Sequence, residues 1–179
     1  ISRYVPVADA ILHFYDQYYR RQHKKTTGQE LDKNGRLVIY PGQALEVYSG
    51  ARNDSAAVSG LRALSEALLE IPEGMTSAED RRFYRNFHDR LPPIPTRECA
   101  GRRCIAPAEA WEAKRLDFNM ELPQLYPVFP FGQYGVGRPD LEIARNTWRY
   151  GFTDAAKQKN YFCWFQGGIF TAGLGLTDE

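Results

Sequence analysis

One irregular segment, residues 119–140, constrains the fold of this chain more than any other stretch. It reads NMELPQLYPVFPFGQYGVGRPD and contains four prolines, four aromatic residues and three glycines. Neither the alternation of a half-buried strand nor the spacing of an amphipathic helix runs through it. Irregular segments of this length in a compact domain are uncommon and are often functional loops. Polar groups among aromatic rings suit a sugar-binding cleft, and they also suit a buried structural loop. Composition alone does not decide between a sugar-binding cleft and a structural loop.

Length and charge limit the classes of protein to consider. The 179 residues, 43% of them hydrophobic, predict one domain with a real core. The 23 basic and 22 acidic residues nearly balance, which argues against a nucleic-acid or membrane-surface partner. No apolar run approaches the ~20 residues of a membrane span. Because the chain starts at Ile1 and ends on a helical pattern without a C-cap signal, we expect a processed or truncated piece of a longer protein.

Helices separated by long connections dominate the expected secondary structure. Apolar periodicity, N-cap residues and prolines set their bounds. The expected helices are residues 5–21, 54–70, 76–90, 139–151 and from about 161 onward. A Lys33-Asn34-Gly35 turn precedes a short strand over residues 37–40, a loop covers 41–53, and strands at 94–99 and 103–106 form a hairpin. The alternation predicts a mainly α fold of the helical toroid type, with its site on loops.

Two cysteines lie at the tip of the expected hairpin. Cys99 and Cys104 flank Ala-Gly-Arg-Arg, and residues opposed across a hairpin can approach within disulfide distance. Two free thiols are an equal alternative. No Cys/His grouping has zinc-site spacing and no glycine-rich stretch fits a phosphate loop, so neither a metal nor another cofactor is expected.

Paired carboxylates are the catalytic option that the loops offer. No serine lies in a nucleophile-elbow setting. Glu46, between Leu45 and Val47, is placed where partial burial would raise its pKa and keep it protonated as a general acid. The alternative is a helix-end or salt-bridge glutamate. Glu121 could likewise pair with an arginine such as Arg97 or Arg138.

The order of five motifs resembles the six-hairpin glycosidases. The motifs are LVIYPGQALEVY, NDSAAVSGLRAL, LPPIP, NMELPQLYPVFPFGQYGVGRPDLEIA and WFQGGIFTAGLGL. More closely, the chain resembles proteins related to glycoside hydrolase family 95, the α-L-fucosidase and α-L-galactosidase family. The resemblance implies part of an (α/α)6 toroid with short β-hairpins in its loops, here a C-terminal portion of the catalytic domain. It places the family's acid on Glu46 and a helix start on Asp54.

The function implied by the resemblance is inverting hydrolysis of a terminal fucose- or galactose-like sugar from a glycan. An inverting site has an acid and a base with room for a water between them. We expect Glu46 as the acid, with Glu121 as the second catalytic group. The expected substrate-binding residues are Gln43, Asn119, Tyr126, Phe129, Trp164 and Gln166. The resemblance also implies a secreted protein, extracellular or periplasmic, completed by the rest of its parent chain or by another subunit.

Two alternatives stay open. One is a catalytically silent sugar-binding or scaffold domain, favoured by Gly167, because related proteins often carry an aspartate at that point. The other is a polysaccharide lyase, which needs a Tyr or His base. His88 is the candidate base, although its place on an expected helix is more typical of a surface or capping residue.

Overall fold

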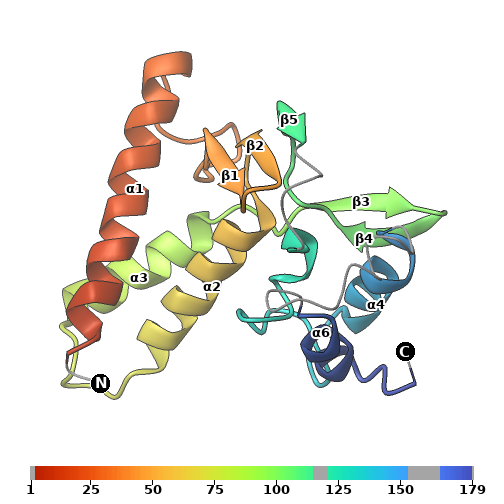
Figure 1. Ribbon diagram of the computed structural model, residues 1–179. Coiled ribbons are helices and arrows are strands. Elements are labelled where there is room, and N and C mark those ends of the chain that lie inside the picture. The colour runs from red at the N-terminus through yellow and green to blue at the C-terminus, as the bar shows by residue number, and fades with distance from the viewer. Residues whose placement is uncertain (1–2, 115–120, 153–165, 179) are drawn as a thin grey trace. The chain divides into compact units, whose positions relative to one another are not determined.

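A computed structural model describes residues 3–114, 121–152 and 166–178 (Figure 1). The fold is mainly α with small antiparallel sheets, as the sequence predicts. Its helices are α1 (Val5–Thr27), α2 (Ser55–Glu70), α3 (Ala78–Arg90), α4 (Leu141–Tyr150) and α6 (Gly167–Leu174), with a 3-10 turn η1 (Pro123–Leu125). Its strands are β1 (Gly42–Ala44), β2 (Tyr48–Ala51), β3 (Thr96–Cys99), β4 (Arg102–Ile105) and β5 (Ala113–Lys114).

The chain divides into two compact units. The first combines Ile1–Tyr40 with Gly60–Pro93, and the second combines Pro41–Ser59 with Ile94–Glu179. Helix α2 begins in the second unit and continues into the first. No helix in the described part of the chain is long and apolar enough to cross a membrane.

Helix α1 of the first unit extends to Thr27, beyond the predicted end at residue 21. Lys24 and Lys25 occupy its last turn, where cations favour the helix dipole, so the basic run remains helical. The helix ends at Gly28, whose φ of 79° suits glycine and whose N–H donates to the Lys24 carbonyl. Helix α1 contacts α3, where the His13 and Phe83 rings stack at 3.8 Å.

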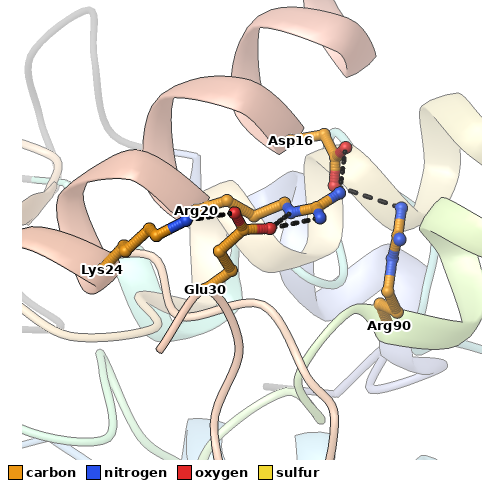
Figure 2. A network of polar contacts seen from close by, with 5 residues as sticks. All are labelled: Asp16, Arg20, Lys24, Glu30 and Arg90. Carbon is orange, nitrogen blue, oxygen red and sulfur yellow. Dashed lines mark hydrogen bonds and ion pairs between the residues drawn. The ribbon is translucent and has the colours of Figure 1, made fainter. Parts of the chain in front are cut away.

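A network of charged side chains ties this unit together (Figure 2). Asp16 accepts hydrogen bonds from Arg20 at 3.3 Å and from Arg90 at 3.1 Å. Glu30 accepts from Arg20 and from Lys24. The hydrogen bond from Arg20, followed by that from Lys24, holds the pKa of Glu30 below its usual value, and the Glu30 contact raises the pKa of Arg20. The network therefore connects α1, the loop after it and the end of α3.

Helices α2 and α3 follow their local signals closely. Asp54 caps α2, because its Oδ1 accepts from the Ala57 N–H at 2.8 Å. The capping box of α3 consists of Ser77 and Asp80, one residue after the predicted start at Thr76. Ser77 has the extended backbone of an N-cap and exchanges hydrogen bonds with Asp80 in both directions, which makes it the cap.

The prediction of a strand at residues 37–40 is wrong. The segment belongs to no strand ladder in the described residues. Leu37, Val38 and Ile39 are instead fully buried, and the Leu37 N–H donates to the Arg90 carbonyl at 2.8 Å. The preceding turn is confirmed, since the Gly35 N–H donates to the Asp32 carbonyl at 3.0 Å.

The described residues of the second unit form two small sheets. Strands β1, β2 and β5 form one antiparallel sheet in that order, and β3–β4 form the predicted hairpin. The prediction of a loop at residues 41–53 is wrong in part, because β1 and β2 lie within it. The Ile105 N–H donates to the Thr147 hydroxyl of α4 at 2.7 Å, which fixes the hairpin on that helix. Buried residues of the hairpin, η1, α4 and α6 form the core of the unit: Ile105, Leu125, Ala144, Trp148, Phe170 and Leu174.

Candidate functional site

Glu46 lies in the turn between β1 and β2. The pairs Gln43↔Ser49 and Ala44↔Tyr48 leave Leu45, Glu46 and Val47 as the connection. Val47 is 5% exposed and belongs to the small core cluster of this sheet, whereas Glu46 is exposed to solvent. The expectation that Glu46 is partly buried is therefore wrong. The reason is local: the hairpin turn directs its apolar residue inward and leaves the carboxylate outside.

Tyr48, two residues after Glu46, anchors an aromatic contact at the other end of the turn. The ring is 4% exposed and meets the Trp111 ring edge-on, with centroids 5.1 Å apart. The Lys114 ammonium lies 5.7 Å from the Tyr48 centroid, in cation–π contact. Burial raises the pKa of the Tyr48 hydroxyl. Trp111 itself stays 37% exposed, so its indole is fixed by Tyr48 and open to solvent.

Polar residues lie near Trp111 along the chain and across the bridge that joins Ala110 to Arg52. The Glu109 carboxylate accepts a hydrogen bond from the Asn53 amide at 2.6 Å and lies 3.4 Å from the Arg52 Nε. The Arg52 N–H also donates to the Ala110 carbonyl at 2.8 Å, which places the segment before Trp111 beside the end of β2. We call Arg52, Asn53, Glu109, Trp111 and Lys114 the Trp111 surface.

Glu121 is held by an aromatic hydroxyl. The Tyr126 hydroxyl donates to Glu121 Oε1 at 2.5 Å. Burial first, and then the contact with Glu121, raises the pKa of Tyr126. The Glu121 carboxylate is therefore oriented by the phenol and can act as a hydrogen-bond acceptor.

One hydrogen bond links the segment that carries Glu121 with the hairpin that carries Glu46. The Gln124 amide, 2% exposed, donates to the Tyr48 hydroxyl at 3.3 Å. The Ser55 hydroxyl donates to the Pro123 carbonyl at 3.0 Å, which fixes η1 to the start of α2. The 3-10 turn η1 thus lies against β2 and the start of α2.

Asp54 is the most strongly perturbed carboxyl near these elements. It is 2% exposed, and burial raises its pKa to about 6, against the lowering effect of backbone hydrogen bonds led by that from Ala57. A carboxyl with this pKa is partly protonated near neutral pH. Its burial and its hydrogen bond to Ala57 make it a helix cap in this conformation, out of reach of a sugar.

The remaining predicted residues lie in several places. Gln43 and Phe129 are exposed, Phe129 to 38%. Gln166 precedes α6, and its side-chain oxygen is buried without a hydrogen-bond partner in the described residues. Asn119 and Trp164 lie outside the described residues.

His88, the candidate base of a lyase, belongs to the first unit. Its Nδ1 lies 2.9 Å from the Ser65 hydroxyl, and its side chain is half-buried. The hydrogen bond between α2 and α3 gives this histidine a packing role.

A concave region lies in the first unit. It is an open concavity of about 420 Å³ at the end of α1, and Lys24, Gln29, Glu30 and Asp32 are among its lining residues. Lys24 and Glu30 pair with each other there. Because these charges already satisfy one another, the concavity offers less to a ligand than the Trp111 surface does.

Sequence reasoning did not identify the Trp111 surface. The stretch AEAWEAK around Trp111 carries no motif, and nothing in the sequence marks Asn53 as a site residue. The antiparallel bridge between Arg52 and Ala110 brings the two stretches together across more than fifty residues. A tryptophan between glutamates was the available signal, but sequence alone does not show which side chains join it.

The described residues hold no group of three or more His, Cys, Asp or Glu side chains suited to a metal ion. The Trp111 surface combines an indole ring with the Glu109 carboxylate, the Asn53 amide and the cationic side chains of Arg52 and Lys114. Compared with family models, curated proteins and solved structures, the chain matches none of them.

Proposed function

We propose that this chain binds carbohydrate through the Trp111 surface, as part of a glycoside hydrolase-like protein. One observation carries the proposal: Trp111 is fixed edge-on against Tyr48 while 37% of it stays exposed, two residues along the chain from the held carboxylate of Glu109. An aromatic ring can cover the apolar C–H face of a pyranose, and neighbouring polar groups can bond its hydroxyls.

The polar groups support this role because they are preorganised. Asn53 and Arg52 hold the two oxygens of Glu109, and each carboxylate oxygen keeps a lone pair for a sugar hydroxyl. Groups that are already ordered lose less conformational entropy on binding. The surface thus presents an apolar plate and an oriented acceptor at once.

Binding to a glycan array, followed by titration calorimetry with the best ligand, tests this proposal. We expect Trp111→Ala to weaken binding by about tenfold or more, roughly the loss of 1.4 kcal/mol. Phe14→Ala is the matched control, because Phe14 is an exposed aromatic residue on α1, 57% exposed, and should leave affinity unchanged. Equal affinity of Trp111→Ala and the unaltered chain would reject the Trp111 surface as the site.

Inverting glycoside hydrolysis is the second candidate function. The observation that favours it is the exposed carboxylate of Glu46 in the turn next to Tyr48, where a glycosidic oxygen could reach it. Glu121, oriented by the hydrogen bond from Tyr126, is the carboxylate proposed as the base. An inverting pair needs carboxyl groups roughly 6.5–9.5 Å apart.

Glu46→Gln separates hydrolysis from binding. If Glu46 is the acid, turnover of fucosides or galactosides should fall by orders of magnitude while glycan affinity persists. Glu98→Gln, an exposed glutamate of β3, is the control and should keep full turnover. Unchanged turnover in Glu46→Gln would remove Glu46 from the mechanism, and binding without any turnover would favour the silent sugar-binding domain.

The proposal includes a larger (α/α)6 toroid, completed by other residues of the parent protein or by another subunit, and an extracellular or periplasmic location. The mainly α fold with hairpins in its connections is compatible with that architecture. The completion of the toroid and the extracellular or periplasmic location are supported by the order of motifs in the sequence.

A further inference from the structure

Cys99 and Cys104 lie on the same face of the β3–β4 hairpin. The register pairs Arg97 with Cys104 and Cys99 with Arg102. Residues two apart on a strand share a face, and cross-strand partners share it too, so Cys99 and Cys104 are diagonal neighbours. The expectation that the two cysteines are directly opposed is wrong, and both are free thiols.

The two cysteines are diagonal neighbours on one face of the hairpin but differ in their access to solvent. Cys104 is fully buried, and burial, followed by the Cys99 contact, raises the pKa of its thiol to about 12. Cys99 is only half-buried, so a small reactant from solvent meets Cys99 first. The nearby Arg97 guanidinium offsets part of this rise in the pKa of Cys104.

We propose that Cys99 and Cys104 form a dithiol site that is oxidised by exchange with small disulfides such as oxidised glutathione. The Cys99 thiolate attacks the external disulfide, forms a mixed disulfide and releases one thiol. The Cys104 thiol then attacks the Cys99 sulfur of the mixed disulfide, and its proton passes to the departing thiolate, which leaves as the second thiol. The protein pair loses two electrons and two protons, and the external disulfide is reduced to two thiols.

The hairpin geometry determines which of the two exchange steps, formation of the mixed disulfide or closure of the Cys99–Cys104 bond, is slower. Diagonal side chains in a regular antiparallel pair are about 7 Å apart, whereas a disulfide needs its Cβ atoms at about 4 Å. The Cys99 end must therefore move toward Cys104 before the bond closes. Cys99 and Arg102 are the last pair before a two-residue turn of Ala100 and Gly101, both with positive φ, and this end of the ladder is the part that can shift. The second step is accordingly the slower one.

Intact mass spectrometry during incubation with oxidised glutathione tests the proposal. Cys163 is first replaced by serine, so that only this pair can react. We expect a transient adduct of one glutathione, followed by a product without adduct that has lost two hydrogens. Trypsin cuts after Arg102 and Arg103, between the two cysteines, so digestion without reduction should leave two peptides joined by the disulfide.

Two variants assign the roles. Cys104→Ala should stop at the glutathione adduct, and Cys99→Ala should gain no adduct, with circular dichroism to confirm folding of each. An adduct that persists in the chain with both cysteines, or two thiols that never react, would overturn the proposal. The tryptic map of the chain with both cysteines decides the matter even when Cys104→Ala fails to fold.

Discussion

The two units of this protein use charged side chains in opposite ways. In the first unit, Asp16, Arg20, Lys24, Glu30 and Arg90 satisfy one another within a single network (Figure 2). In the second unit, Glu109 is oriented by its neighbours beside an exposed indole, and Asp54 is buried with a raised pKa. Charges that are paired among themselves stabilise a fold, whereas oriented groups beside an aromatic surface are available to a ligand.

The largest effect that we expect from this contrast is on the stability of the first unit. Asp16→Ala leaves Arg20 and Arg90 without their shared carboxylate, which is 10% exposed. Loss of one partner of a mostly buried ion pair should lower the free energy of unfolding by about 2–4 kcal/mol. Urea denaturation measures the change, and glycan affinity should not change.

Asp89→Ala is the control for this variant. Asp89 is an exposed carboxylate of α3, and its removal should change the free energy of unfolding by less than about 0.5 kcal/mol. If Asp16→Ala lowers the free energy of unfolding no more than Asp89→Ala does, the charged network does not stabilise the first unit.

The buried carboxyl of Asp54 makes the stability of the second unit depend on pH. Its folded pKa of about 6 lies above the ordinary 3.8, so the folded state binds more protons than the unfolded state between about pH 4 and pH 6. The Asp54 contribution to the free energy of unfolding therefore falls as pH rises through this window, by about 1–3 kcal/mol in total. Asp54→Asn keeps a good cap and should remove this slope, so the variant should be the more stable one at pH 7.

Denaturation at several pH values checks this expectation. Asp140→Asn, at the exposed start of α4, is the control and should keep the slope of the unaltered chain. An Asp54→Asn variant with the same slope as the unaltered chain would show that Asp54 is not the titrating group.

Alanine substitutions at two glycines distinguish the cost of a left-handed backbone from the cost of side-chain crowding. Gly50 has a φ of 59°, and a Cβ there would lie 2.4 Å from the Glu112 Cδ, whereas Gly28, at φ 79°, has open space around it. Gly28→Ala should cost about 1 kcal/mol for the left-handed conformation alone, and Gly50→Ala about 2 kcal/mol. Thermal unfolding measures both. If crowding by Glu112 causes the additional destabilisation of Gly50→Ala, the double variant Gly50→Ala/Glu112→Ala should be about as destabilised as Gly28→Ala.

The smallest expected effect concerns the start of α3. Ser77→Ala removes the observed cap and should lower the free energy of unfolding by about 1 kcal/mol. Thr76→Ala, at the position that the sequence predicts as the cap, should cost less. A larger loss for Thr76→Ala would restore the sequence-based assignment.

Local signals explain most of what could be predicted. The start of α2 at Asp54, the end of α3 before its prolines and the β3–β4 hairpin each depend on a few adjacent residues. The β1–β2 hairpin was missed because its turn uses Leu45 at a positive φ, which nothing in the sequence indicates. Apolar residues 37–39 suggested a strand, but burial without a ladder produces the same pattern.

The sequence by itself determined the mainly α class, most helix starts and ends, and the irregular character of the 119–140 segment, because caps, prolines and periodicity act between near neighbours. Only the tertiary structure decided that Glu46 is exposed, that Glu121 pairs with Tyr126, and that Arg52 and Asn53 meet Glu109 beside Trp111. The last of these contacts joins residues more than fifty positions apart. Exposure and long-range pairing depend on how the whole chain packs, and no local pattern encodes them.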